Sequence, residues 1–430
     1  MKNEQVRMKN VLSFLLFVAF SCSLAFAQQP AIALKGGKLL TITHGVIPDG
    51  VLVIENGKIA AVGPAASTRI PANAKVVDVT GMTVYPGLID SETNLGLVEI
   101  PAVQATVDVV EPSDEIMPQM HVYDAFHAET AAIPVTRLNG ITNAIVAPGT
   151  RDTLPGQDSF IQLYGRDAQE MLTVRDIAMP LNFTGDQRRG GGPDASGRVF
   201  PTTRMGMAAQ LRQAFLDAQE YQRKLNGPKG NEVKRDLKLE ALLPYLAGKK
   251  TVVVSADEPD DVLTAIGLAK EFNLHFVLDH LVHSESVLDT VAAQHVPVIV
   301  GPIYEQPQDD RRYDQVYRLP AELVKRGVKI AFASYDTHNA RNLPYAAGFA
   351  VGYGLPWEEA MKALTINPAE IWGVADRLGS LDVGKDANVV VANGDPLDVR
   401  TDVKRVFIAG HEVPMRSFQT ELRDEYSQKQ

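Results

Sequence analysis

The chain has 430 residues, of which 45% are hydrophobic and 22% are charged, and its formal net charge is −10 at pH 7. This is enough apolar material for one large α/β domain and a smaller one, and it excludes an intrinsically disordered chain. The acidic excess is dispersed, so the sequence offers neither a basic face for nucleic acid nor a polybasic patch for a membrane surface.

Residues 1–27 have the pattern of a secretory signal peptide. A basic start is followed by an apolar run over 11–20 and by the small residues Ala25 and Ala27. The run is about half as long as the roughly 20 residues that a membrane span needs. We therefore expect cleavage near Ala27 and a mature chain that is periplasmic or secreted. Cys22, the only cysteine, is lost with this segment, which excludes disulfides and a thiolate nucleophile.

Two strand-rich segments lie at opposite ends of the mature chain, over residues 28–85 and 379–430. In the first, "VLVIENGKIAAVGP" contains Asn56 and Gly57, a two-residue hairpin signal. In the second, "DANVVVANGDP" and "VKRVFIAG" are β-branched runs bounded by turn residues. We expect the two segments to form one small β-sandwich built from both chain ends.

In the middle of the chain, residues 86–378, apolar runs alternate with longer segments whose sequence is typical of helices. Eight runs read as buried strands: 84–89, 142–149, 158–165, 173–183, 250–257, 274–280, 296–302 and 328–336. Eight strand-like runs, several of them followed by a helix-like segment, predict an α/β fold with a (β/α)8 TIM-like barrel. The Gly-rich stretch 185–204 lacks the Lys-Ser/Thr ending of a phosphate loop, so we interpret it as a loop over the barrel mouth.

The stretches before and after the predicted barrel resemble those of a known protein family. "VVDVTGMTVYPGLIDS" leading into the barrel, and "NPAEIWGV" followed by "GSLDVGKDANVVV" closing it, resemble the amidohydrolase superfamily, close to its imidazolonepropionase-like branch. The resemblance implies a zinc-bearing barrel that hydrolyses amide or other C–N bonds of small molecules. The metal would lower the pKa of a bound water and polarise the carbonyl.

Three of the metal positions implied by the resemblance depart from the family pattern. Glu92 and Asn94 stand where the family has His-x-His after the first strand, and Ser255 stands where it has a histidine after the fifth. An amide oxygen and a hydroxyl are poor zinc ligands beside imidazole. After the sixth strand, either His280 or His283 matches the remaining histidine position.

The eighth strand and the loop after it supply the other residues that the resemblance implies. Asp336 matches the carboxylate that binds metal and transfers the proton of water. Arg341 and His338 follow it, where an arginine could hold a substrate carboxylate through two hydrogen bonds.

Two alternative sites are weaker interpretations. A substitute metal site could use His121 and His127 with Asp114 and Glu115, although histidines six apart do not share a helical face. A Ser-His-Asp arrangement could join Ser255, His280 and Asp336 at the barrel mouth.

The sequence therefore leaves two functions open. One is an exported C–N hydrolase with a single metal held by Glu92, a histidine and Asp336. The other is a catalytically inactive binding module or a non-catalytic subunit, in a homo-oligomer or beside an active relative. The hydrolase would use zinc and an amide-type substrate. The inactive binding module or subunit would hold no metal.

Overall fold

The structure is a computed structural model that describes residues 30–183, 201, 203–227, 233–304 and 311–427. The predicted signal peptide and most of the predicted mouth loop 185–204 lie outside the described residues. None of the helices in the described ranges is long and apolar enough to cross a membrane. Two eight-stranded sheets form the framework of the molecule.

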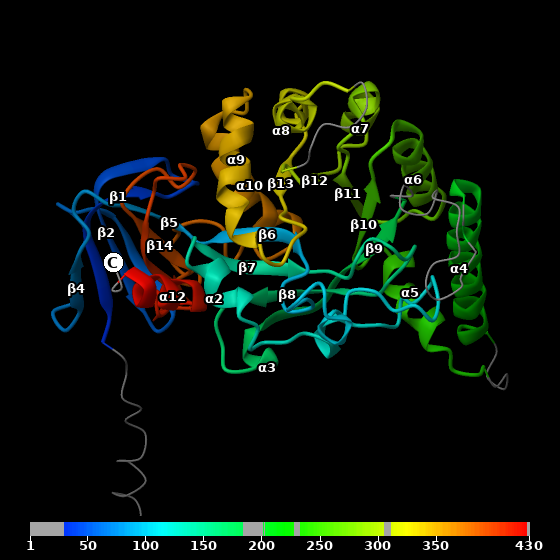
Figure 1. Cartoon of the computed structure of the whole chain (residues 1–430), viewed down its shortest axis with the longest axis horizontal. Coiled ribbons are helices and arrows are strands. Elements are labelled where there is room, and N and C mark those ends of the chain that lie inside the picture. Colours follow the sequence, from blue (N-terminus) through cyan, green and yellow to red (C-terminus); the bar gives the residue numbers. More distant parts are fainter. Residues whose placement is uncertain (1–29, 184–200, 202, 228–232, 305–310, 428–430) are drawn as a thin grey trace, which may run out of the picture.

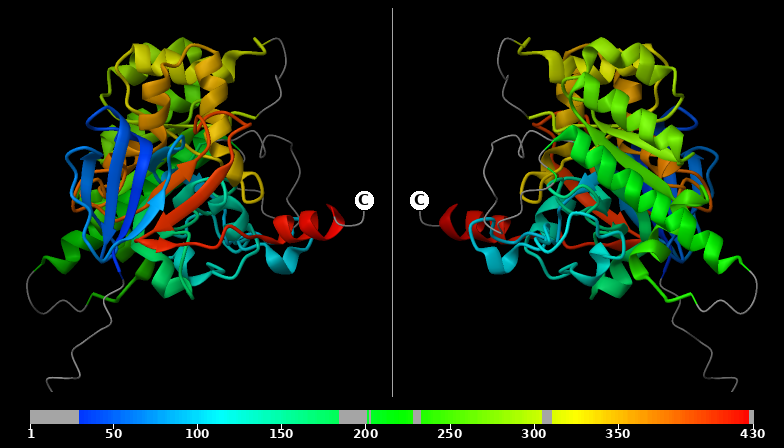
Figure 2. Two further views of the ribbon diagram at one scale, coloured as in Figure 1. Left: turned by 90° about the vertical axis from the view of Figure 1, so that its left-hand side faces the viewer. Right: turned by 90° about the vertical axis from the view of Figure 1, so that its right-hand side faces the viewer.

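The first sheet combines both ends of the described chain. Its strands are β1(Ile32–Leu40), β2(Val46–Glu55), β3(Lys58–Pro64), β4(Lys75–Asp78), β5(Thr83–Pro86), β14(Val389–Ala392), β15(Val403–Ile408) and β16(His411–Glu412). The order is β16-β15-β14-β5-β1-β2-β3, and β4 pairs with β1. Figures 1 and 2 show the N-terminal strands in blue beside the C-terminal strands in orange and red.

The predicted small β domain built from both chain ends is therefore confirmed. The antiparallel pairing of β5 with β14, from Thr83 opposite Ala392 to Pro86 opposite Val389, joins the two ends. The predicted hairpin is present as well. Asn56 and Gly57 have φ of 52° and 78° between β2 and β3, as a type I′ turn requires.

The second sheet is a nearly closed barrel. Its strands are β6(Leu88–Thr93), β7(Ile141–Val146), β8(Asp158–Gln162), β9(Leu172–Asn182), β10(Thr251–Ala256), β11(Phe276–His280), β12(Val298–Val300) and β13(Ile330–Phe332), in that order. Between β13 and β6, the Ser334 NH donates to Asp90 Oδ1 (2.9 Å) and the Tyr335 NH donates to the Glu92 carbonyl (3.0 Å). The predicted TIM-like barrel is confirmed.

Two details of the barrel differ from the sequence prediction. The first barrel strand begins at Leu88, not at Val84, because Thr83–Pro86 belongs to the other sheet. In addition, β8 runs antiparallel to both neighbours. No helix of the described chain lies between β7 and β8, and antiparallel strands need no crossover helix.

Helices follow most of the other strands and cover the outside of the barrel (Figure 1). They are α2(Ala132–Arg137), α3(Ala168–Met171), α4(Arg204–Leu225), α5(Leu237–Leu246), α6(Pro259–Glu271), α7(Leu288–Ala292), α8(Gln315–Lys325), α9(Leu343–Gly352), α10(Trp357–Leu364), α11(Ile366–Ile371) and α12(Phe418–Ser427). Short 3-10 turns are η1(Gln104–Thr106), η2(Val122–Asp124), η4(Glu285–Val287) and η5(Ala340–Asn342). Asp236 caps α5 by accepting from the NH groups of Lys238 and Leu239.

Apolar side chains fill the barrel lumen below its mouth. They come from alternate positions of the strands: Ile89, Ile145, Phe160, Val253, Val277 and Ile299. Trp372 and Leu378, which follow α11, belong to the same cluster. The Asn367 amide donates to the carbonyl of Ile330, at the start of β13 (2.9 Å). The amino-terminal end of the barrel is thus plugged, and the polar residues gather at the other end.

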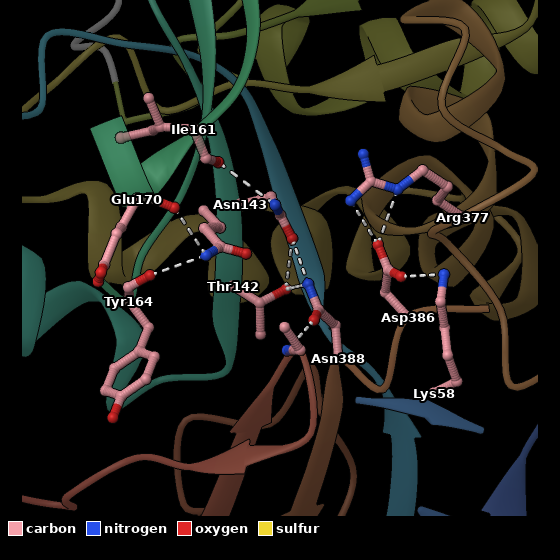
Figure 3. A network of polar contacts seen from close by, with 11 residues as sticks. Lys58, Thr142, Asn143, Ile161, Tyr164, Glu170, Arg377, Asp386 and Asn388 are labelled. Carbon is pink, nitrogen blue, oxygen red and sulfur yellow. Dashed lines mark hydrogen bonds and ion pairs between the residues drawn. The ribbon is translucent and has the colours of Figure 1, made fainter. Parts of the chain in front are cut away.

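Polar contacts connect the barrel with the segment before β14 (Figure 3). The Asn388 amide donates to Asn143 Oδ1 on β7 (2.6 Å), and Asn388 Oδ1 accepts from the Ala409 NH (2.7 Å). Nearby, Asp386 accepts from both Arg377 and Lys58. These contacts fix the β domain against the barrel.

Candidate active site at the barrel mouth

Asp279 is the central acceptor at the carboxyl end of the barrel strands. It lies on β11 with no exposed surface. Its carboxylate accepts from Ser255 Oγ (2.9 Å), from His280 Nδ1 (2.7 Å) and from the hydroxyl of Tyr335. Ser255 and Asp279 are register partners on β10 and β11, so their side chains point to the same face of the sheet.

Glu92 is the fourth partner of Asp279. Its side chain is buried, and burial followed by the charge of Asp279 raises the pKa of its carboxyl well above the ordinary value. Two carboxyl groups share a hydrogen bond only when one carries a proton. The raised pKa favours the protonated form of Glu92, which can donate to Asp279.

Two more buried carboxyls lie on the barrel wall. Burial and then Asp279 raise the pKa of Asp158, on β8, well above its ordinary value. Burial raises the pKa of Asp90 to about 7, although Ser334 donates to it through both its NH and its hydroxyl. The mouth is thus a low-dielectric site that disfavours further negative charge.

Asn94 and Asp336 are turned to other partners. The Asn94 amide donates to the Ala147 carbonyl (2.9 Å). The Asp336 carboxylate accepts from the NH groups of His338 (2.7 Å) and Asn339 (3.1 Å) in its own loop. Burial alone would raise the pKa of Asp336, but the hydrogen bonds from Asn339 and His338 outweigh it and lower the pKa.

The remaining predicted residues lie around the rim. His338 is exposed, and Arg341 donates to the His338 carbonyl (2.7 Å), which holds the loop after β13. His280 is bound to Asp279, whereas His283 is half-buried on the following loop. The mouth therefore brings together Glu92, Ser255 and His280, but not Asn94, Asp336 or Arg341.

The two alternative sites are not assembled by the structure. His121 pairs with Asp176 (2.7 Å), Asp114 with Lys238, and Glu115 accepts from Thr153, so these side chains are committed to different partners. In the Ser-His-Asp proposal, Ser255 and His280 both bind Asp279 instead of each other. The hydroxyl thus has an acid as its acceptor, not an imidazole base.

Sequence reasoning missed Asp279 and Tyr335. Each directly precedes a predicted residue, His280 or Asp336, so the error is one position along the strand. The signal that could have found Asp279 is alternation: Val277 faces the lumen, and Asp279 is two residues further on the same face. Tyr335 has φ of 53°, a turn that strand periodicity does not predict.

The residues present do not fit a zinc ion. Zinc needs three or four converging ligands, preferably imidazole or thiolate. Asn94 and Asp336 are held by other groups, and Ser255 donates its proton to Asp279. In the described part of the chain, no three His, Cys, Asp or Glu side chains form a group that could hold a metal.

A cavity of about 310 Å³ lies beside the mouth, between the ends of β12 and β13 and helix α9. Its lining includes Tyr304, Ser334, Asp336, Asn339 and Leu343. This volume is at the lower end of the range for small-molecule sites.

Comparisons with known proteins agree with this architecture. A model of the amidohydrolase family matches residues 247–413. The amidohydrolase tasK of Hapsidospora irregularis is 24% identical over 386 residues, which cover 84% of this chain but only 39% of that protein. The imidazolonepropionase of Picrophilus torridus is 24% identical over 373 residues, 81% of this chain and 87% of that protein.

Solved structures are similar over almost the whole described chain. An amidohydrolase from Thermotoga maritima MSB8 is 30% identical, with a TM-score of 0.82, over 90% of this chain and 100% of that one. Molinate hydrolase is similar in fold alone, with a TM-score of 0.56 at 17% identity, over 90% of this chain and 95% of that one.

Proposed function

Because the chain belongs to the amidohydrolase family, in its imidazolonepropionase-like branch, we propose that it is an exported member whose barrel mouth has exchanged zinc for internal hydrogen bonds. In this proposal the protein binds a small molecule at the mouth and does not carry out zinc-dependent hydrolysis. The similarity to proteins named amidohydrolase and imidazolonepropionase supports the class of ligand.

The observation that carries the proposal is the position of Asp279. Its carboxylate takes donors from two positions where the family resemblance implies metal ligands, Glu92 and Ser255. A zinc ion would have to displace both donors, and it would gain one hydroxyl and one carboxyl group in return. Glu92 and Ser255 are therefore better suited to hydrogen bonding with Asp279 than to binding zinc.

A second candidate is a C–N hydrolase that works without zinc. The neutral Glu92 beside the carboxylate of Asp279 places a proton donor next to an acceptor, as general acid–base chemistry requires. Glu92→Gln would abolish such an activity. Activity of purified protein on a panel of cyclic amides and N-acyl amino acids, lost in this variant and insensitive to chelator, would favour this candidate.

Thermal stabilisation by zinc tests the first candidate. A metal bound only by the folded chain stabilises it by about 2.7 kcal/mol at a hundredfold excess over Kd, so binding would raise Tm. We expect no rise for the natural chain. A triple variant places histidine at the three positions that depart from the family pattern: Glu92→His, Asn94→His and Ser255→His. We expect zinc to raise the Tm of this variant.

A natural chain stabilised by micromolar zinc would overturn the proposal. A folded triple variant that zinc does not stabilise would show instead that the metal positions are wrongly matched.

Export and assembly belong to the same proposal. N-terminal sequencing of protein purified from its own cells should find a start near Gln28, and a retained Lys2 or Met8 would contradict export. A binding module of this kind suits the role of a non-catalytic subunit beside a zinc-competent relative. Native mass spectrometry of the same preparation measures whether a partner is present.

A further inference from the structure

The barrel mouth contains buried hydrogen-bond acceptors that no group among the described residues satisfies. Within those residues Asp158 Oδ1 and Asn182 Oδ1 have no partner, and each residue is 1% exposed. Buried polar atoms are almost always paired, so two orphaned acceptors at one end of a barrel point to a missing donor.

Both acceptors face the lumen. Asn182 on β9 is the register partner of Ser255, whose hydroxyl reaches Asp279, so Asn182 shares their face of the sheet. Asp158 is two positions before Phe160, which belongs to the lumen cluster. Asp158 also interacts electrostatically with Glu92 and Asp279.

The carboxyl groups at this place have few basic neighbours. Three carboxyl groups, those of Glu92, Asp158 and Asp279, lie within electrostatic reach of one another. In the described residues, neither lysine nor arginine forms an ion pair with any of them, and His280 on Asp279 is their one basic neighbour. A positively charged ligand would relieve both the repulsion and the orphaned acceptors.

We propose that the barrel mouth binds the protonated amine or amidinium group of a small molecule, with Asp158 Oδ1 and Asn182 Oδ1 accepting its N–H donors near the carboxylate of Asp279. An ammonium group carries three donors and a positive charge, which matches an acceptor set with negative charge. The proposal assigns the rest of the molecule to the cavity lined by Ser334 and Asp336, the two residues that flank Tyr335 in the chain. This inference rests on the proposed function, since it needs a mouth that is free of metal.

The test measures binding of simple amines by calorimetry and thermal shift on the full chain. The probes are n-butylamine, putrescine and agmatine, with n-butanol as the neutral control and tetramethylammonium as a cation without N–H donors. We expect the amines to bind and raise Tm, and both controls to fail.

The decisive variant is Asp158→Asn, which keeps the side-chain shape but cannot ionise beside a bound cation. Neutralising a buried carboxyl should leave the unliganded protein at least as stable, so loss of binding is not loss of fold. We expect at least tenfold weaker amine binding. Asp217→Asn, on the exposed face of α4, is the matched control and should bind as the natural chain does.

Amines that fail to bind, or that bind the Asp158→Asn protein as tightly as the natural chain, would overturn this inference and leave the proposed function standing. A parallel titration with zinc and calcium chloride separates the two. Stoichiometric metal binding would overturn the proposed function as well.

Discussion

At the scale of single residues, Asp279 explains why the mouth is stable without a cation among its own side chains. Its carboxylate accepts from a serine, an imidazole, a phenol and a protonated carboxyl. Each donor lies on a different position of the barrel wall, so the acceptor links β6, β10, β11 and the end of β13. Charge-assisted hydrogen bonds of this kind are about twice as strong as neutral ones.

Replacement of Glu92 tests its role as a donor to Asp279. Glu92→Gln keeps an N–H donor, so we expect the free energy of unfolding to stay within about 1 kcal/mol of the natural chain. Glu92→Ala removes the donor from a buried carboxylate, and we expect a loss of roughly 1–3 kcal/mol. Urea denaturation at pH 6 measures both. Equal losses in the two variants would mean that Glu92 fills space and donates nothing.

The raised pKa of Asp90 predicts an unusual dependence of stability on pH. The folded pKa of about 7 lies above the unfolded value near 3.8, so this group stabilises the fold fully below pH 3.8. That contribution is lost as pH rises through 7, by up to about 4 kcal/mol. Asp90→Asn should remove this slope from unfolding measured between pH 4.5 and 8.

The exposed Asp49→Asn is the control for this measurement and should keep the slope. A pH profile identical in the natural and Asp90→Asn proteins would show that Asp90 ionises normally in the fold.

Single residues were also where sequence reasoning was least complete. It selected Glu92, Ser255 and His280, which do meet at the mouth, because a position after a strand can be read from the apolar pattern. It did not predict Asp279 or Tyr335, since the turn at Tyr335 changes which side chain enters the lumen. Hydrogen-bond partners depend on loop geometry, which the periodicity of the sequence does not predict. The bond from the Asn94 amide to the Ala147 carbonyl is an example.

At the scale of elements, the contact between β7 and the segment before β14 couples the two sheets (Figure 3). Asn388 donates to Asn143 Oδ1 and accepts from the Ala409 NH. Both hydrogen bonds are shielded from water, because Asn143 and Asn388 are buried. The amide thus bonds groups from two other segments, β7 and the turn after β15.

Loss of this amide should weaken the whole fold. Asn388→Ala leaves the Ala409 NH without its acceptor, and we expect a loss of roughly 1–3 kcal/mol in the free energy of unfolding. Asn393→Ala, which removes the exposed hydrogen bond to the Asp402 NH, is the matched control and should cost less. Chemical denaturation compares them, and equal losses would contradict the coupling.

Elements were largely predictable. Apolar runs without alternation identified all eight barrel strands, because strands buried on both faces leave that pattern. The antiparallel direction of β8 was not predictable, since a short buried run looks the same in either direction. The start of β6 was misplaced because the apolar run 84–89 contributes to strands of two sheets, β5 before Gly87 and β6 after it.

At the scale of the whole molecule, the chain ends complete one sheet. Deletion from Ser380 would remove β14, β15 and β16 and expose the residues that pack against them, including Leu34, Leu52 and Val84. We expect the truncated chain to be insoluble, because β5 would lose its neighbour β14 and the core would lose the buried side chains after Ser380: Leu381, Ala387, Val389, Val391 and Phe407. A truncated chain that stays soluble with an unchanged Tm would contradict a composite β domain.

The central claim is that the mouth of this amidohydrolase-family barrel is held by hydrogen bonds to Asp279 in place of zinc, and metal content measures it most directly. The full chain, produced in zinc-supplemented medium and purified without chelator, is analysed by inductively coupled plasma mass spectrometry. The account predicts less than about 0.1 equivalents of zinc, manganese or iron per folded chain, the level expected when no set of three ligands is present. Near-stoichiometric metal that is lost in Glu92→Gln would contradict it.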